Sequence, residues 1–429
     1  MNSSYPSSYY AASANRKTAR PALAESLEAD VCVIGAGFTG LSSALHLAER
    51  GYSVVVLEGS RIGFGASGRN GGQIVHSYSR DMDFIENHYG TDTANAMGSM
   101  AFEGGKIIRR LVKQYDIQCD LKDGGIFASC NQKQFRGLQH HKALWEKHGN
   151  DQLELLDAKQ VQDYIGTSRY TGALLDKSGG HIHPLNLTLG EADAIESLGG
   201  KIFEDSPVTF VEQGENPLVK TAKGQVRCKY VMIATNAYVE GIGNIFPQLT
   251  SKSMPCGTQV ITTEPLSEAQ QKELLPQDYC VEDSNYLLDY YRLSGEGRLI
   301  YGGGVTYGAR EPGKIESLIR PKMLKTFPQL KDVKIDYAWT GNFLLTLMRL
   351  PQFGRVGNNI FYAQGYSGHG VTSTHLAGEL VASAIQGHAE RFDVFAGLPQ
   401  YPFPGGRMLR VPYTAIGAFY YDLRDKLGI

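Results

Sequence analysis

A short apolar run, a glycine-rich turn and an amphipathic segment follow one another near the start of the chain. Residues 31–34 (VCVI) are continuously apolar, as in a buried strand, and residues 41–50 place apolar side chains three and four positions apart, which is helical spacing. Gly51 ends the helical pattern, and residues 54–57 (VVVL) form a second apolar run. The pattern predicts a strand–turn–helix–strand unit within about 30 residues.

Two different textures follow along the rest of the chain. Residues 84–175 are polar with mostly helical periodicity, whereas residues 245–345 are rich in apolar runs typical of strands. The other elements predicted are a helix at 185–198, strands at 201–203, 208–211, 230–234 and 360–363, and helices at 315–326 and 371–386. Pieces of nucleotide-binding type therefore lie at the start, middle and end of the chain, with other material between them.

This arrangement predicts an α/β (α+β) fold of two interleaved domains. One is a Rossmann-like nucleotide-binding domain, and the other is a substrate domain built on a β-sheet. The expected boundaries are an N-terminal extension at 1–29, a nucleotide-binding domain at 30–83, 181–243 and 352–390, a substrate domain at 84–180 and 244–351, and a C-terminal tail at 391–429.

Composition and charge exclude several classes of protein. The chain has 42 Lys and Arg against 44 Asp and Glu, a formal net charge of −2, so no basic excess exists for binding nucleic acid. The six cysteines are scattered without a C-x-x-C pair, which is typical of reduced thiols in a cytoplasmic protein. No run approaches the roughly 20 apolar residues of a membrane span, and residues 1–29 lack the apolar stretch of a signal peptide.

The turn after the first strand carries a dinucleotide fingerprint, which we call the first glycine loop (residues 35–40, GAGFTG). Gly35 permits the tight turn, Gly37 lets the backbone approach a pyrophosphate, and Gly40 allows close helix–strand packing. The helix that follows presents free N–H groups to an anion. Glu58 ends the next strand, where a carboxylate accepts hydrogen bonds from ribose hydroxyls.

The nucleotide could be NAD or FAD, and three features favour FAD. A second glycine loop (residues 61–73) follows the second strand and could run beside a long cofactor. The strand at 230–234 runs into Thr235 and Asn236, and the strand–glycine–helix unit at 360–386 offers another helix N-terminus. In flavoproteins such a helix dipole points at the flavin and stabilises the reduced ring. An NAD enzyme needs only the first fingerprint.

Three segments together carry a resemblance to a known family: the first glycine loop, residues 66–68 (ASG), and a third glycine loop at residues 365–370 (GYSGHG). The chain is similar, over almost its whole length, to the FAD enzymes of the D-amino-acid oxidase, glycine oxidase and sarcosine oxidase family. The resemblance implies an FAD-binding domain with cofactor contacts from Gly35, Ala36, Gly37, Phe38, Thr39, Gly40, Glu58, Gly59, Arg61, Ala66, Ser67, Gly68, Gln73, Ile74, Val208, Thr235, Asn236, Gly365, Tyr366, Ser367, Gly368, His369, Gly370 and Val371.

Some family members attach the flavin covalently through a cysteine just before the final nucleotide-binding segment. The corresponding residues here, 337–341 (YAWTG), contain no cysteine. We therefore expect non-covalent FAD.

The resemblance also bears on the substrate. Relatives that oxidise N-methyl amino acids hold the α-carboxylate with basic residues, and the comparable positions here are approximately His76 and Thr372. The missing clamp favours a terminal primary amine, such as γ-glutamylputrescine or a close polyamine derivative. The aromatic residues expected at the substrate wall, each of which could equally be core packing, are Tyr286, Tyr290, Tyr291 and Trp339.

The expected reaction transfers a hydride from the amine carbon to the flavin, so it needs positioning more than a dedicated base. His369, in the third glycine loop, and Trp339 are the candidate catalytic residues. His181 and His183 alternate along an extended segment and face opposite sides, so no metal site is expected.

The expected function is FAD-dependent oxidation of a primary amine in polyamine catabolism, giving aldehyde, ammonia and hydrogen peroxide, with molecular oxygen as acceptor. Two alternatives stay open: a dehydrogenase that passes electrons to a carrier, and a flavin-binding sensor without turnover. The sequence also allows a homo-oligomer.

Overall fold

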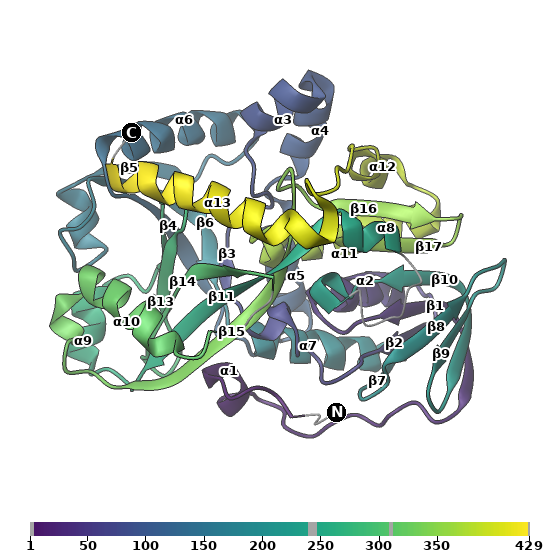
Figure 1. Ribbon diagram of the computed structural model, residues 1–429. Helices are drawn as coiled ribbons and strands as arrows, with labels where there is room; N and C mark the ends of the chain where they lie inside the picture. The colour runs from purple at the N-terminus through teal and green to yellow at the C-terminus, as the bar shows by residue number, and fades with distance from the viewer. Residues whose placement is uncertain (1–3, 239–246, 309–311, 428–429) are drawn as a thin grey trace.

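Two large sheets lie side by side in the computed structural model, which describes residues 4–238, 247–308 and 312–427 (Figure 1). Sheet A has the order β16-β17-β10-β1-β2-β7, with a hairpin of β8 and β9 attached to β10. Its strands are β1 (Ser26–Ile34), β2 (Val54–Leu57), β7 (Lys201–Phe203), β8 (Val208–Glu212), β9 (Leu218–Thr221), β10 (Gln225–Ile233), β16 (Gln352–Val356) and β17 (Ile360–Gln364).

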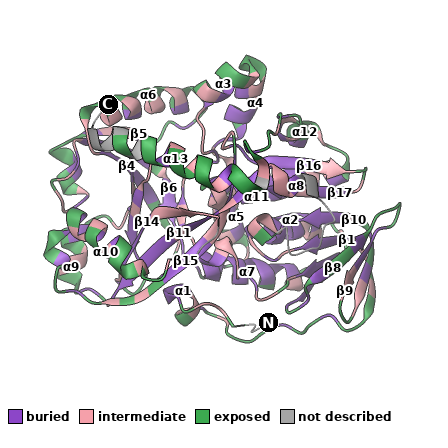
Figure 2. Cartoon of the chain, viewed as in Figure 1, coloured by how far each residue is buried: buried purple, intermediate pink, exposed green. Residues whose placement is uncertain are grey.

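The centre of sheet A is parallel, with Val31 of β1 opposite both Val54 of β2 and Tyr230 of β10. Its middle strands are buried on both faces, which is why they read as continuous apolar runs. The helices that pack around its centre are α2 (Phe38–Glu49), α5 (Glu103–Gln114), α7 (Pro184–Ser197) and α11 (Gly370–Gln386). Figure 2 shows this central region as largely buried.

Sheet B is mostly antiparallel and has the order β15-β11-β14-β13-β12-β4-β6-β3, with β5 paired to β6. Its strands are β3 (Gln73–Ile74), β4 (Lys122–Ser129), β5 (Leu153–Asp157), β6 (Gly172–His181), β11 (Ser253–Thr263), β12 (Cys280–Asp283), β13 (Asp289–Leu293), β14 (Leu299–Tyr307) and β15 (Ile335–Thr346). The other helices are α1 (Tyr9–Ala12), α3 (Met82–Tyr89), α4 (Thr91–Met100), α6 (Gln132–Lys147), α8 (Pro247–Ser251), α9 (Glu268–Leu274), α10 (Ile315–Thr326), α12 (Glu390–Ala396) and α13 (Gly406–Leu427).

The strands of each sheet come from separate stretches of the chain, which agrees with the expected interleaving. The helices expected at 185–198, 315–326 and 371–386 are present as α7, α10 and α11. The expectation of mostly helical structure over 84–175 is met by α3, α4, α5 and α6, but the segment also contains β4, β5 and the start of β6, which were not expected. The apolar pattern of β4 and β6 is obscured because β4 begins with Lys-Asp-Gly-Gly and β6 ends with Ser-Gly-Gly-His.

The N-terminal extension is folded onto both sheets. Figure 1 shows α1 beside α7 and below β15. Tyr10 is fully buried, with its ring 5.3 Å from Trp339 and 5.0 Å from His183. The Arg292 guanidinium donates to the Tyr10 hydroxyl at 3.0 Å and to the Gly71 carbonyl at 2.7 Å. Tyr10 therefore closes the junction between β13, β15 and the second glycine loop.

This packing makes the extension a stability determinant. Truncating Tyr10 to alanine is expected to cost about 3–5 kcal/mol, because a large buried ring is lost. Tyr10→Phe removes only the hydroxyl and is expected to cost about 1–2 kcal/mol. Urea unfolding measures both, with Tyr401→Ala as the control, since that ring is 49% exposed. Equal stability of Tyr10→Ala and wild type would contradict the packing role.

Candidate functional site

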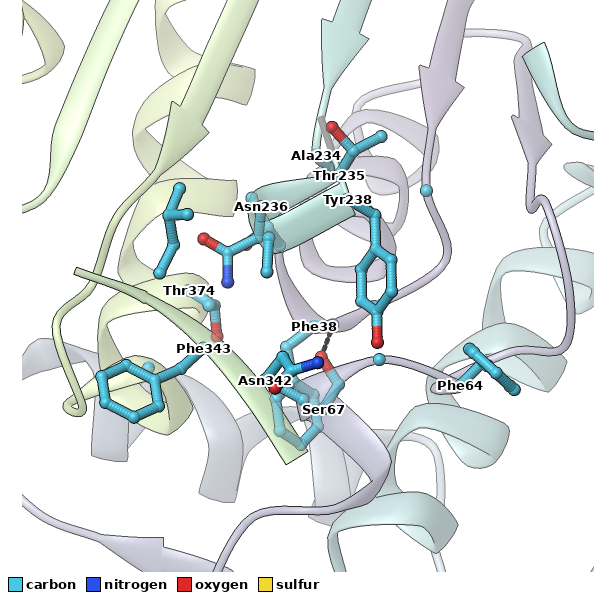
Figure 3. A pocket seen from close by; sticks show the side chains of 18 of the residues that line it. Phe38, Phe64, Ser67, Ala234, Thr235, Asn236, Tyr238, Asn342, Phe343 and Thr374 are labelled. Atoms are coloured by element: carbon cyan, nitrogen blue, oxygen red, sulfur yellow. Dashed lines mark hydrogen bonds between the residues drawn. The ribbon is translucent and has the colours of Figure 1, made fainter. Parts of the chain in front are cut away.

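A cavity of about 530 Å³ lies where β1, β2 and β10 end. Its sheet A side is formed by the first, second and third glycine loops, and β15 of sheet B contributes residues 342–344. Figure 3 shows Ser67, Asn236, Asn342 and Thr374 around this space. The carboxyl ends of parallel strands are the usual ligand-binding edge of such sheets.

The first glycine loop is packed too closely for any side chain. A Cβ on Gly40 would lie 1.9 Å from the Gly35 carbonyl oxygen, and one on Gly37 would lie 2.8 Å from the Ser67 hydroxyl. Gly35 itself has φ +104°, which side chains rarely adopt. The loop thus brings bare backbone to the cavity wall at the start of α2, where N–H groups can hold a phosphate.

The second glycine loop folds back onto the first. The Gly63 N–H donates to the Ala36 carbonyl at 2.9 Å, and the Phe38 N–H donates to the Ser67 hydroxyl oxygen at 2.9 Å (Figure 3). Ser67 belongs to a short 3₁₀ turn, Ala66–Gly68. The two loops therefore form one rigid surface beside the N-terminus of α2.

Glu58 stands at the end of β2, on the same edge. Its carboxylate accepts from the Ala36 N–H at 2.8 Å and from the Ser60 N–H at 2.9 Å. Burial raises the pKa of Glu58, and these two N–H groups act in the opposite direction. A carboxylate held here is placed to accept hydrogen bonds from a nucleotide ribose.

The third glycine loop is tied to three other elements. The Gly365 N–H donates to Asn236 Oδ1 at 3.0 Å, the Tyr366 hydroxyl lies 2.9 Å from Thr39 Oγ1, and the Ser367 N–H donates to the Leu344 carbonyl at 3.1 Å. Helix α11 begins directly after it, at Gly370. A second helix N-terminus therefore meets the cavity.

Among the residues that the structure describes, two buried polar atoms of the cavity wall find no hydrogen-bond partner: Thr235 Oγ1 and Asn342 Oδ1. Leaving such atoms unpaired costs about 1–3 kcal/mol each, so they indicate a polar ligand. The phosphate cradle at α2, the carboxylate of Glu58 and the helix N-terminus at α11 together fit an elongated dinucleotide. These residues fit FAD: the N-terminus of α2 would hold its pyrophosphate, and the third glycine loop would hold its flavin.

Most residues predicted to bind the cofactor line this cavity: Gly35, Gly37, Phe38, Thr39, Glu58, Gly59, Ala66, Ser67, Val208, Thr235, Asn236, Tyr366, Ser367, Gly368, Gly370 and Val371. Four more belong to the same loops without lining it: Ala36, Gly40, Gly68 and Gly365.

Three predicted cofactor residues make other contacts. The Arg61 guanidinium pairs with Glu204 at 3.1 Å, and the Gln73 amide donates to the Val281 carbonyl at 2.9 Å. Ile74 lines a second, smaller cavity of about 290 Å³. The structure does not bring these three side chains to the main cavity.

His76 and His369, far apart in sequence, are brought together. Their ring centroids are 4.9 Å apart, and His76 lies 4.5 Å from the Trp145 ring. The Nδ1 atom of each histidine is buried and has no hydrogen-bond partner within the described part of the chain. Burial, reinforced for His369 by the neighbouring His76, lowers the pKa of each imidazole to about 3. Both rings are therefore neutral at ordinary pH.

The four aromatic residues predicted for the substrate wall are not among the residues that line the main cavity. The Trp339 indole donates to the Arg69 carbonyl at 3.0 Å, so it supports the second glycine loop from behind. The Tyr290 hydroxyl lies 3.1 Å from Thr258 Oγ1, and a Cβ on Gly71 would lie 2.7 Å from the Tyr290 ring. These two aromatic side chains therefore contact the glycine loop rather than the main cavity.

The remaining predicted substrate residues lie in three different settings. Tyr291 stacks on Tyr301 at 5.3 Å in the core of sheet B, away from the cavity. Thr372 is buried in the first turn of α11, with its hydroxyl unpaired. Tyr286 accepts a hydrogen bond from Arg349 at 2.8 Å. Any substrate role of these residues remains a prediction.

Several wall residues were missed from the sequence: Phe64, Asn70, Pro207, Tyr238, Asn342, Phe343, Leu344 and Thr374. Thr374 follows Gly370 by one helical turn and could have been found from helical spacing. The β15 residues carry no local motif, because they reach the cavity only through the pairing of sheet B.

Comparisons with known proteins agree with this site. A family model described as FAD dependent oxidoreductase matches residues 30–384. The chain is 63% identical over 425 residues to γ-glutamylputrescine oxidoreductase of Escherichia coli K12, with 99% of each chain covered. It is 42% identical to the probable oxidoreductase OrdL of Haemophilus influenzae, covering 98% of this chain and 97% of that one.

Two solved structures share the fold at low identity. Glycine oxidase from Geobacillus kaustophilus has a TM-score of 0.69 and 20% identity, covering 84% of this chain and 95% of that one. L-Proline dehydrogenase from P. horikoshii has a TM-score of 0.71 and 21% identity, covering 95% and 99%.

The chain belongs to the FAD-dependent oxidoreductases of the D-amino-acid oxidase type. It is an enzyme, and its cofactor is FAD. Among residues 4–238, 247–308 and 312–427, no helix is both long and apolar enough to cross a bilayer, and no group of three acidic, histidine or cysteine side chains is placed to hold a metal ion.

The packing at Gly40 predicts a sharp effect of one methyl group. Gly40→Ala is expected to abolish FAD binding, because its Cβ would collide with the Gly35 carbonyl and displace the loop. The flavin content of purified protein, read from its visible absorbance, measures this. Gly137→Ala is the control, since nothing lies within 4 Å of a Cβ there. A yellow, fully loaded Gly40→Ala protein would show that the close approach is dispensable.

The neutral histidines predict acid sensitivity. With the pKa of His76 at about 3 in the folded state and about 6.5 unfolded, the unfolded chain takes up the proton first. Stability is therefore full above about pH 6.5 and falls as the pH drops toward 3, by about 1.4 kcal/mol per pH unit. Between pH 7.5 and 5, His76→Gln should lose about 2 kcal/mol less than wild type in urea unfolding. Exposed His388→Gln serves as control, and an unchanged loss in His76→Gln would refute the assignment.

Proposed function

We propose that this enzyme oxidises the terminal primary amine of γ-glutamylputrescine, or of a close polyamine derivative, to an aldehyde, releasing ammonia and hydrogen peroxide. The observation that carries the proposal is the 63% identity, over 99% of both chains, to the γ-glutamylputrescine oxidoreductase of Escherichia coli. Molecular oxygen is the proposed acceptor, and polyamine catabolism is the proposed context. The six cysteines, all free, support a reducing compartment such as the cytoplasm.

FAD, when bound, supplies the acceptor for the hydride that leaves the amine carbon. The chain's own contribution is a neutral, shaped surface beside the third glycine loop. An alkylamine has a pKa of about 10, so the neutral form that can lose a hydride must be selected on binding. Neutral His76 and His369 put no positive charge in the way of that amine and leave unpaired Nδ1 atoms beside it.

The same neutrality bears on the substrate class. At the positions where amino-acid-oxidising relatives are expected to hold a carboxylate, this chain has His76 and Thr372. A neutral imidazole and a buried threonine do not neutralise an adjacent carboxylate. This supports an amine whose reacting carbon bears no carboxyl group. Non-covalent attachment of FAD is proposed on the same footing, since residues 337–341 contain no cysteine.

Anaerobic mixing of the holoenzyme with amines tests the proposal. We expect γ-glutamylputrescine to bleach the flavin absorbance at least tenfold faster than putrescine, cadaverine or spermidine, with sarcosine and D-alanine inert. Admitting air should restore the colour within seconds and yield one peroxide per turnover. Bleaching by the amino acids alone would refute the amine assignment. Slow recolouring in air would indicate a dehydrogenase, and no bleaching by any compound would indicate a sensor.

A further inference from the structure

A tight turn between β15 and β16 carries an arginine in an unusual conformation. The Arg349 N–H donates to the Thr346 carbonyl at 3.2 Å, closing the turn, and Arg349 itself has φ +61°. Residues other than glycine adopt this conformation uncommonly, at a cost of order 1–3 kcal/mol. Such strain in a surface turn would disappear with glycine, so an arginine here invites a functional explanation.

The turn is attached directly to the third glycine loop. The Thr346 N–H donates to the Ser367 hydroxyl at 3.2 Å, and a Cβ on Gly365 would lie 2.6 Å from the Thr346 methyl. Asn342, Phe343 and Leu344, which precede Thr346 on β15, line the cofactor cavity. Arg349 is therefore held near the third glycine loop, outside the residues that line the cavity.

The Arg349 guanidinium contacts a tyrosine and, among the described residues, no carboxylate. It donates to the Tyr286 hydroxyl at 2.8 Å and lies 5.5 Å from the centre of the Tyr286 ring. Within the described parts of the chain, no carboxylate forms an ion pair with it. The remaining donors of its planar fork match a carboxylate, which an arginine can bind through two parallel hydrogen bonds.

The charge of Arg349 also acts on His369, in the third glycine loop. It adds to burial and to His76 in lowering the pKa of His369. The geometric link is the hydrogen bond from the Thr346 N–H to the Ser367 hydroxyl, which joins the turn of Arg349 to the third glycine loop. Arg349 is thus a cation near this loop that has no carboxylate partner among residues 4–238, 247–308 and 312–427.

We propose that Arg349, positioned by Tyr286, binds the distal carboxylate of the substrate. This proposal rests on the proposed function and assigns the part of the site that recognises the γ-glutamyl group. In γ-glutamylputrescine, nine bonds separate the oxidised carbon from the α-carboxylate carbon, which extended is about 10 Å. A carboxylate recognised this far from the flavin is chemically distinct from one recognised on the reacting carbon. The enzyme would then bind free putrescine poorly, because free putrescine has no carboxylate to pair with Arg349.

The test compares two substrates that differ only at the distal group: γ-glutamylputrescine and its α-carboxamide analogue. In wild type we expect KM for the amide to be 10- to 100-fold higher, with similar kcat. In Arg349→Gly, KM for the acid should rise to that of the amide, whose own KM stays unchanged. Glycine suits φ +61°, so this variant keeps the turn, and its melting temperature and FAD content verify folding. Arg349→Lys, which keeps the charge, should restore part of the discrimination.

A binding measurement removes the dependence on turnover. γ-Glutamylbutylamide has the carboxylate and the chain but no terminal amine, and calorimetric titration should show at least tenfold weaker binding to Arg349→Gly than to wild type. The control is Arg355→Met on the neighbouring strand β16, whose guanidinium pairs with Asp393 at 2.8 Å.

The outcomes distinguish a failure of the proposed function from a failure of the role assigned to Arg349. If wild type fails to oxidise γ-glutamylputrescine, the proposed function is wrong. If wild type oxidises it but Arg349→Gly keeps the preference for the acid, or loses both substrates equally, the assignment of Arg349 is wrong while the function stands. A collapsed preference with intact amide turnover supports the assignment.

Discussion

The structure depends on how closely the backbone of α2 approaches the turn that follows β1. With no room for even a methyl group between Gly40 and the Gly35 carbonyl, the helix begins at the end of the strand and its free N–H groups face the cavity. The second glycine loop packs on this turn through Ser67, and the third is joined to α2 through Tyr366 and Thr39. Three loops that are distant in sequence therefore take their positions from one glycine contact.

The parts of the site made by local sequence could be predicted, and those made by sheet pairing could not. The first loop, Glu58 and residues 365–371 were found because glycine spacing after an apolar run constrains the backbone wherever it occurs. Asn342 and Phe343 were missed because β15 reaches the cavity through its ladder with β11, at a sequence distance of more than 80 residues. The family resemblance implies a cofactor contact for Arg61, and its guanidinium pairs with Glu204 in the structure.

The same distinction applies to the fold. Central strands of sheet A, buried on both faces, read as continuous apolar runs, whereas β4 and β6 contain glycines and charges that hide their alternation. The aromatic residues predicted for the substrate wall could not be told apart from core residues by sequence alone. Tyr290 and Tyr291 are neighbours in β13, so their side chains point to opposite faces, and Tyr291 is committed to the core of sheet B.

The position of α1 has a consequence for how the molecule comes into being. Tyr10 is synthesised before its neighbours Arg292 and Trp339, which lie 282 and 329 residues further along the chain. Tyr10 cannot make these two contacts until Arg292 and Trp339 have been synthesised. Closure of the two-sheet junction is thus a late event in biosynthesis.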